Sequence, residues 1–316
     1  MRASSRQGQQ PIFAPRTRDW SDLRMTKRGL VIGAGGVTGL AWSSGTLAAL
    51  EEATGWDPRT ADVLVGTSQG AFLSGLLASS VATQDLTRWY RRELPETHPL
   101  RSRAARRAEA SGRRGLPLPA SPTLLARAVG PRRIMPLAAL SGLLPVGTGS
   151  LDAFLAPLAA VVGDDVWVPH PATWVTALDY DSGRRICFGA PGWPQPPFLD
   201  AVRASCTVPG QFPPVVIDGR RYVDGGAHST TNADVVADAG LDEVVVLAPM
   251  AGEDGLLRRV AQRQLRAEAR RLERAGTTVR VLMPTREDRV LMDARPLDMT
   301  ARSAIFENVL ARGWTG

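Results

Sequence analysis

Ser68 stands between two glycines where an apolar run ends. Residues 63–66 read VLVG, and the small-residue stretch GAFLSGLLAS begins at Gly70. A serine hydroxyl attacks a carbonyl carbon when a base takes its proton and a tight turn exposes it. A sharp strand-to-helix turn gives this exposure and crowds the positions two residues away on each side, where glycine lacks a Cβ. The pattern of Gly66, Ser68 and Gly70 therefore predicts a nucleophile for acyl transfer.

A glycine-rich turn supplies the second requirement of that chemistry, which is a set of donors for the oxyanion of the tetrahedral intermediate. Residues 33–39 read GAGGVTG and follow an apolar stretch. We expect Gly35 and Gly36 to direct their backbone N–H groups toward Ser68. A dinucleotide fingerprint is the alternative for this turn. Its spacing does not fit, because Thr38 occupies the sixth position, and no acidic residue follows the second apolar run.

Two arrangements could supply the base that takes the proton of Ser68. The sequence contains three histidines: His98, His170 and His228. His228 follows Asp224 by four residues, so a Ser-Asp-His triad is available in the chain order of many hydrolases. In the simpler arrangement Asp224 acts directly on Ser68, while Gly225 and Gly226 allow the carboxylate to approach. The sequence leaves both arrangements open.

Alternating strands and helices must position these residues. Apolar runs predict strands at 28–33, 62–66, 173–180, 184–189, 242–249 and 277–284, with a hairpin over 213–226 that turns at Asp218-Gly219. Helices are expected at 40–52, 70–80, 84–93, 197–205, 255–275 and 299–312. Strands that alternate with helices are typical of a parallel sheet with crossover helices.

Charge is distributed unevenly along the 316 residues. The net formal charge is +7, yet residues 1–28 carry +5 and residues 88–133 carry +9, so the remainder is acidic. Residues 1–27 are predicted to be a disordered basic arm, followed by one domain over 28–316. Regular periodicity fails over 95–150, which indicates an inserted cap segment rich in arginine and apolar residues. Basic blocks of this kind favour peripheral contact with an anionic membrane.

Composition also argues against several other classes of protein. Cys187 and Cys206 are too few for a disulfide framework or a zinc site, and no metal is expected. Residues 134–163 are the most apolar stretch, but prolines and glycines interrupt them before they reach a membrane-spanning length. No secretory signal is evident, so a cytoplasmic protein, peripheral on the inner face of the membrane, is expected. Aromatic residues do not alternate with the arginines, so nucleic-acid binding is not expected.

Three blocks of the sequence resemble the patatin-like phospholipase family. They are GLVIGAGGVTGLAW, DVLVGTSQGAFLSGLLAS and AVRASCTVPGQFPPVVIDGRRYVDGGA, in the order and spacing of that family. The last block is the most specific, because a Ser-x-x-x-Pro-x-x-Phe-Pro-Pro run precedes Asp-Gly-Gly. The resemblance covers residues 28–94 and 170–285.

The resemblance implies a three-layer α/β/α fold with a mainly parallel central sheet, and a Ser-Asp dyad that hydrolyses acyl esters of lipids through an acyl-enzyme. Ser68 would be the nucleophile and Asp224 the base, with no cofactor. The backbone N–H groups of Gly35, Gly36 and Gln69 would form the oxyanion hole. The supporting glycines would be Gly33, Gly39, Gly66, Gly70, Gly225 and Gly226.

Two alternatives to a hydrolase remain. A transacylase would use the same residues and pass the acyl group to an alcohol. A lipid-binding protein without activity is the other alternative, because Thr38 stands where the family usually has Arg or Lys and because residues 227–236 depart from the family pattern. The sequence does not determine the lipid ester, its chain length or the oligomeric state.

Overall fold

The computed structural model describes most of the chain. The described residues are 26–101, 119–124, 136–294 and 301–313. The predicted basic arm lies outside them except for its last two residues, and the middle of the predicted cap segment lies outside as well.

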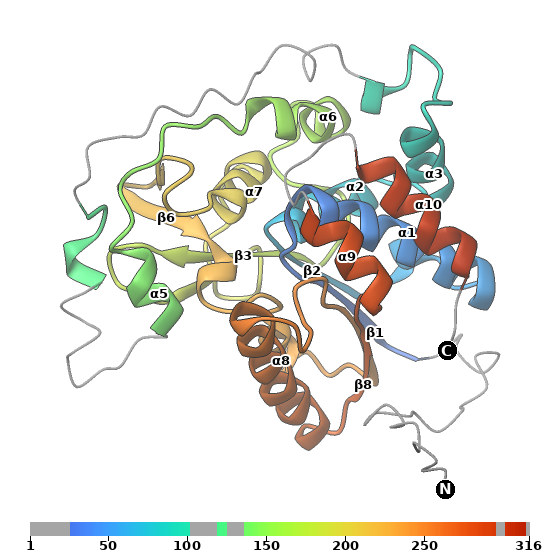
Figure 1. The fold of residues 1–316 in the computed structure, drawn as a ribbon. Helices are drawn as coiled ribbons and strands as arrows, with labels where there is room; N and C mark the ends of the chain where they lie inside the picture. The colour runs from blue at the N-terminus through green and yellow to red at the C-terminus, as the bar shows by residue number, and fades with distance from the viewer. Residues whose placement is uncertain (1–25, 102–118, 125–135, 295–300, 314–316) are drawn as a thin grey trace, which may run out of the picture.

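The centre of the molecule is one eight-stranded sheet (Figure 1). Its strands are β1 (Arg28–Ile32), β2 (Val63–Thr67), β3 (Thr173–Asp179), β4 (Arg185–Phe188), β5 (Val215–Ile217), β6 (Arg220–Asp224), β7 (Glu243–Leu247) and β8 (Thr278–Leu282). The order is β5-β6-β3-β2-β1-β7-β8, and β4 also pairs with β3. Five neighbouring strands, β3, β2, β1, β7 and β8, run parallel to one another. The strands β4 and β6 pair antiparallel with β3, and β5 pairs antiparallel with β6. The predicted mainly parallel sheet is confirmed.

Helices and short 3₁₀ turns connect these strands. The helices are α1 (Gly36–Thr54), α2 (Gln69–Ala78), α3 (Thr83–Arg91), α5 (Pro136–Ser141), α6 (Asp152–Val162), α7 (Phe198–Cys206), α8 (Leu256–Arg274), α9 (Arg286–Ala294) and α10 (Arg302–Arg312). The 3₁₀ turns are η2 (Pro58–Thr60), η3 (Pro99–Arg101), η5 (Gly225–Ala227) and η6 (Ala233–Val236).

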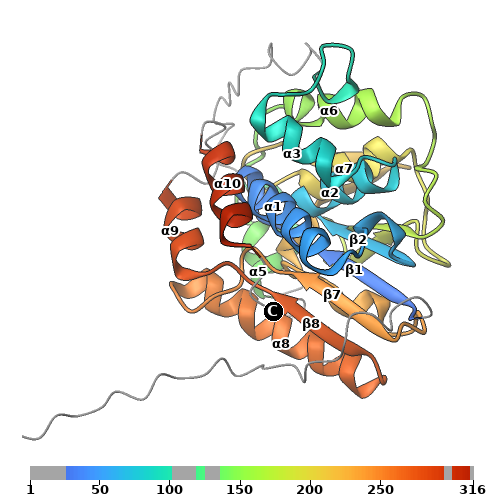
Figure 2. The ribbon, with the colours of Figure 1, turned by 90° about the vertical axis from the view of Figure 1, so that its right-hand side faces the viewer.

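Helices cover both faces of the sheet. Leu30, Ile32 and Leu64 belong to an apolar core that also includes side chains of α1, α2, α7 and α10. Val31 and Val65 point to the opposite face and share a core with side chains of α8. Figure 2 shows α8 on one side of the sheet and α1, α2 and α10 on the other. Because neighbouring strand residues point to opposite faces, a strand buried on both faces is apolar throughout. The three-layer α/β/α prediction is confirmed.

The helix α2 is the central element for the site. All ten of its residues are buried, and it packs between β2, α1, α6 and α7. A helix that is apolar on every side is typical of a buried position. Its small residues permit this close packing, so the start of α2 is fixed against the ends of the parallel strands.

Four helical features differ from the sequence predictions. The helix α1 begins at Gly36 instead of residue 40, and Gly36 has a φ of 63° that leads the chain directly from the glycine-rich turn into the helix. The helices α6 and α9 were not predicted. The helix α5 lies in the predicted cap, where no periodicity was found. In the described part of the chain, no helix combines the length and the apolar character needed to cross a membrane.

Candidate active site

Ser68 occupies a sharp turn between β2 and α2. Its φ and ψ are 57° and −124°, and its residue is 7% exposed. A positive φ is uncommon for a residue other than glycine, and such a conformation costs on the order of 1–3 kcal/mol. Ser68 is also the N-cap of α2, so the free N–H groups of the first helical turn surround it. This is the strand-turn-helix arrangement in which a serine nucleophile is presented.

The two glycines beside Ser68 are required by close backbone approaches. A Cβ on Gly70 would lie 1.9 Å from the carbonyl oxygen of Ile32, at the end of β1. A Cβ on Gly66 would lie 2.3 Å from the Cα of Ala71. Any side chain at either position would therefore displace α2 from the sheet.

Asp224 ends β6 and lies within hydrogen-bonding reach of Ser68. The Ser68 side chain lies close enough to the Asp224 carboxylate to lower its pKa, and the N–H of Gly226 donates to Asp224 Oδ1 over 2.7 Å. Burial raises the pKa of Asp224 to about 6, because the ionised carboxylate loses its hydration, while the contacts with Ser68 and Gly226 act in the opposite direction. A carboxylate with this pKa is ionised at neutral pH and is a better proton acceptor than an exposed aspartate.

The C-terminal end of α7 holds both members of this pair. The backbone N–H of Ser68 donates to Ser205 Oγ over 2.8 Å, and the Ser205 hydroxyl donates to the carbonyl of Thr176 over 2.7 Å. Two residues later, the carbonyl of Thr207 accepts the backbone N–H of Asp224 over 2.9 Å. In the sequence, the block that contains Ser205 is recognisable only as a family signature. Its physical role is to join the turn at residue 68 to the end of β6.

Replacement of Ser205 by alanine is expected to lower both stability and turnover. The N–H of Ser68 and the carbonyl of Thr176 would lose their partner in a fully buried place, which costs about 1–3 kcal/mol per orphaned group. We expect a lower free energy of unfolding and a fall in kcat, with KM little changed, because the turn loses its anchor.

The matched control for Ser205→Ala is Ser74→Ala. Ser74 is also fully buried, in α2, but its hydroxyl has no hydrogen-bond partner among the described residues. Ser74→Ala should leave stability and activity nearly unchanged in denaturant unfolding and steady-state assays. Equal effects of the two variants would contradict the anchoring role of Ser205.

The glycine-rich turn offers donors beside Ser68. The N–H groups of Gly33 and Ala34 are used, since they donate to Leu247 and Thr230 over 2.9 and 2.7 Å. Within the described residues, no acceptor is found for the N–H groups of Gly35, Gly36 and Gln69. These are the three amides that the sequence analysis predicted for the oxyanion hole.

Two further contacts fix the position of this turn. The Gln69 side chain is buried, and its Nε2 donates to the carbonyl of Gly33 over 2.6 Å. A Cβ on Gly35 would lie 2.8 Å from Cγ of Pro249, and one on Gly39 would lie 3.4 Å from Cβ of the same proline. From the sequence, only the backbone N–H of Gln69 was expected to have a role. Its side chain joins the start of α2 to the glycine-rich turn.

One buried carboxylate on α8, that of Glu268, holds the loop that follows Asp224. Glu268 on α8 accepts hydrogen bonds from the hydroxyls of Ser229 and Thr231 over 2.5 and 2.6 Å, and from the N–H of Ala233 over 2.8 Å. Burial raises the pKa of Glu268. This loop is the part that departs from the family pattern, and Glu268 is a supporting residue that the sequence analysis missed.

The glycines of this loop are also closely packed. A Cβ on Gly225 would lie 2.6 Å from the carbonyl oxygen of Thr176, and one on Gly226 would lie 3.3 Å from Cβ of Ala34. The Asp-Gly-Gly segment therefore lies against the glycine-rich turn on one side and against β3 on the other. Hydroxyl, carboxylate and free amides thus come from three separate parts of the chain: the turn at Ser68 and Gln69, the glycine-rich turn, and the end of β6.

Among the described residues, no hydrogen bond joins any of the three histidines to Ser68 or Asp224. His170 bonds through Nε2 to the carbonyl of Ala61 over 2.8 Å, and His98 Nδ1 accepts the N–H of Leu100. The charges that act on His228 are Arg185 and Asp234. Its Nδ1 has no partner among the described residues. Burial lowers the pKa of His228 to about 4, so the ring is neutral at pH 7.

Replacement of His228 by glutamine therefore separates a dyad from a triad. If Asp224 acts directly, hydrolysis of a nitrophenyl ester should stay within about threefold of the unmodified protein, whereas loss of a general base costs about 10²–10⁴-fold. His98→Gln, in a segment remote from the dyad, is the matched control. A large loss confined to His228→Gln would favour the triad.

Comparison with known proteins agrees with these features. A family model described as Patatin-like phospholipase matches residues 30–237, which is well over half of the chain. The solved structure of VipD from Legionella pneumophila is similar at 14% sequence identity and a TM-score of 0.39, over 91% of this chain and 67% of that one. The matched range contains the turn at Ser68, the glycine-rich turn and the Asp-Gly-Gly segment. The chain belongs to the patatin-like phospholipase family.

Proposed function

We propose that this protein is a lipid acyl hydrolase in which Ser68 is the nucleophile and Asp224 the base. The observation that carries the proposal is the proximity of the Ser68 hydroxyl to the buried carboxylate of Asp224, whose pKa is raised by burial to about 6. Membership of a phospholipase family supports a lipid ester as substrate. The free amides beside Ser68 support stabilisation of an oxyanion.

The reaction has two halves. Ser68 Oγ attacks the ester carbonyl carbon while Asp224 accepts the hydroxyl proton, and the N–H groups of Gly35, Gly36 and Gln69 bind the oxyanion. The intermediate collapses, the C–O bond to the alcohol breaks, and Asp224 returns the proton to the departing alcohol. A water molecule then attacks the acyl-enzyme with Asp224 again as the base, and the fatty acid is released with Ser68 restored.

A fluorophosphonate probe tests the first half of the proposal. Only an activated serine reacts with such a probe, so the unmodified protein should be labelled at Ser68 and the Ser68→Ala protein should not. Hydrolysis of nitrophenyl acyl esters should disappear with the labelling. Labelling at another serine, or undiminished hydrolysis by Ser68→Ala, would refute the proposal.

Product analysis tests the second half. With a phospholipid or glycerolipid substrate, a hydrolase releases free fatty acid even when an acceptor alcohol is present. A transacylase would instead give a new ester in proportion to the acceptor. The ratio of acid to ester therefore identifies the acyl acceptor once labelling at Ser68 has been established.

We further propose that the protein works at an anionic membrane surface. The net charges of +5 over residues 1–28 and +9 over residues 88–133 support this contact. The described part of the cap contributes exposed apolar side chains at Leu140, Leu143 and Leu144. Sedimentation with vesicles that contain phosphatidylglycerol should exceed sedimentation with zwitterionic vesicles, and should fall as salt is added.

A further inference from the structure

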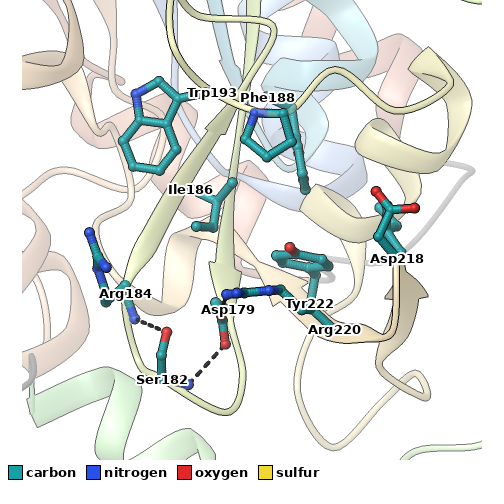
Figure 3. Close-up of a pocket in the computed structure, with 11 residues that line it drawn as sticks. Asp179, Ser182, Arg184, Ile186, Phe188, Trp193, Asp218, Arg220 and Tyr222 are labelled. Carbon is teal, nitrogen blue, oxygen red and sulfur yellow. Dashed lines mark hydrogen bonds and ion pairs between the residues drawn. The ribbon is translucent and has the colours of Figure 1, made fainter.

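A pocket of about 370 Å³ lies on the antiparallel end of the sheet, between the β3–β4 and β5–β6 hairpins (Figure 3). Its apolar walls come from Ile186, Phe188, Trp193, Pro194, Ile217 and Tyr222. None of the residues assigned to the dyad or to the oxyanion hole lines it. This size is at the low end of the range of about 300–1,000 Å³ found for small-molecule sites.

One strand, β6, nevertheless carries both a residue that lines the pocket and the proposed base. Tyr222 lies two residues before Asp224 on β6, so both side chains point to the same face of the sheet. Phe188 packs edge-to-face against Tyr222, with ring centroids 5.2 Å apart. The Tyr222 hydroxyl has no hydrogen-bond partner in the part of the chain that the structure describes. It is therefore available to a ligand.

Charges at the mouth of the pocket are not all satisfied within the protein. Asp179 accepts the N–H groups of Asp181 and Ser182 over 3.0 and 2.8 Å, and its other oxygen faces Arg220 over 3.4 Å. Its negative charge is thus compensated. The guanidinium of Arg184 has no partner among the described residues, and Figure 3 shows it directed toward Trp193.

A separate carboxylate, Asp218, lies on the other side of the pocket in Figure 3, on the β5–β6 turn. The pocket therefore has a cationic end at Arg184 and Trp193, followed by apolar walls. A ligand that fits has one anionic group and a short hydrocarbon body. A guanidinium binds a carboxylate through two parallel hydrogen bonds, which makes a carboxylate the favoured anionic group.

We propose that this pocket binds a medium-chain fatty acid, with its carboxylate on Arg184 and its chain against Ile186, Trp193 and Ile217. The choice of a fatty acid rests on the proposed function, because hydrolysis of an acyl ester releases this class of product. The pocket is separate from the site at Ser68, so it is a second site for the product on the strand that carries the base.

Calorimetric titration of the Ser68→Ala protein with octanoate tests the proposal. Octanoate should bind saturably, and octanol, which has the same chain without the charge, should bind about tenfold more weakly. Arg184→Gln should weaken octanoate binding by about tenfold and leave octanol binding unchanged. Arg270→Gln, which removes an exposed arginine on α8, is the matched control and should have no effect.

Tryptophan fluorescence tests whether octanoate binds in this pocket. Octanoate should change the tryptophan emission of the Ser68→Ala protein, and most of that change should disappear when Trp193→Phe is added. Ile217→Trp fills the pocket and should remove binding of octanoate and octanol alike. The proposal is overturned by the absence of saturable binding, by equal affinities for octanoate and octanol, or by binding that persists in Arg184→Gln and Ile217→Trp.

Failure of this inference can be distinguished from failure of the proposed function. The Ser68→Ala protein turns over no substrate, so the binding result does not depend on catalysis. If the unmodified protein hydrolyses esters but does not bind octanoate, the fatty-acid site is refuted and the proposed hydrolase function stands. If octanoate binding depends on Arg184 but no ester is hydrolysed, the pocket is a carboxylate site and its ligand is not a reaction product.

Discussion

A protein carrying Asp224→Asn is expected to lose about 10²–10⁴-fold in kcat/KM for ester hydrolysis, the usual contribution of a general base. The asparagine amide keeps the shape of the side chain and an oxygen that can accept the N–H of Gly226. It cannot take the proton of Ser68. The loss should therefore appear in kcat, whereas substrate binding and the fold remain.

The same substitution is expected to stabilise the fold near neutral pH. The pKa of Asp224 is about 6 in the folded protein and 3.8 for the ordinary group, so the folded state binds this proton more tightly than the unfolded state. Stability from this group is present below pH 3.8 and is lost as the pH rises through 6. The difference amounts to about 3 kcal/mol at pH 8. Asparagine does not titrate and avoids this loss.

Unfolding in urea at pH 4 and pH 8 measures the effect. The free energy of unfolding of Asp224→Asn should exceed that of the unmodified protein at pH 8, and the two should approach each other at pH 4. Asp238→Asn, at an exposed position, is the control and should change neither activity nor this pH dependence. An Asp224→Asn protein that retains activity would show that Asp224 is not the base.

The pH dependence of the unmodified enzyme provides an independent test. Asp224 must be ionised to accept a proton, so kcat/KM should fall on the acid side with a midpoint near pH 6, where burial has placed the pKa. An exposed aspartate would give a midpoint about two pH units lower. A profile that is flat between pH 5 and 8 would contradict the assignment.

The fold was predictable from the sequence because its signals are local. The buried strands read as continuous apolar runs, and the predicted turn at Asp218-Gly219 has positive φ values of 50° and 74°, as a tight hairpin requires. The helix α9 was missed although it carries a recognisable start. Thr285 and Asp288 exchange hydrogen bonds between side chain and backbone, which is a capping box.

Residues of the candidate site were predictable only where a short sequence motif marks the turn at the end of a strand. Ser68 follows a strand and Asp224 ends one, and both have glycines within two residues, so their neighbours indicate them. Ser205 and Glu268 have no such signal, because their partners are distant in sequence. Ser205 is 137 residues from Ser68, and Glu268 is 35 to 39 residues from the groups it binds. Contacts of this range are set by the packing of α7 and α8, which no local pattern specifies.

Replacement of Gly70 by alanine is expected to have the largest effect on the fold. Its new Cβ would lie 1.9 Å from the carbonyl oxygen of Ile32, and both the strand and the helix are fully buried there. A backbone oxygen cannot move aside as a flexible side chain can. Overpacking of a core costs about 1–3 kcal/mol, and we expect a loss of free energy of unfolding at or above the upper end of this range.

Two other glycines give a graded series against which Gly70→Ala can be judged. A Cβ on Gly75, also in α2, would meet only side chains, at 2.7 Å from Phe198, and one on Gly252 would meet the flexible Arg289 at 3.2 Å. Thermal unfolding should therefore rank the losses as Gly252 least, Gly75 intermediate and Gly70 greatest. Folded Gly70→Ala protein should also lose fluorophosphonate labelling, because the helix that presents Ser68 must shift. A Gly70→Ala protein that melts and labels like the unmodified one would mean that α2 does not approach β1 as closely as this site requires.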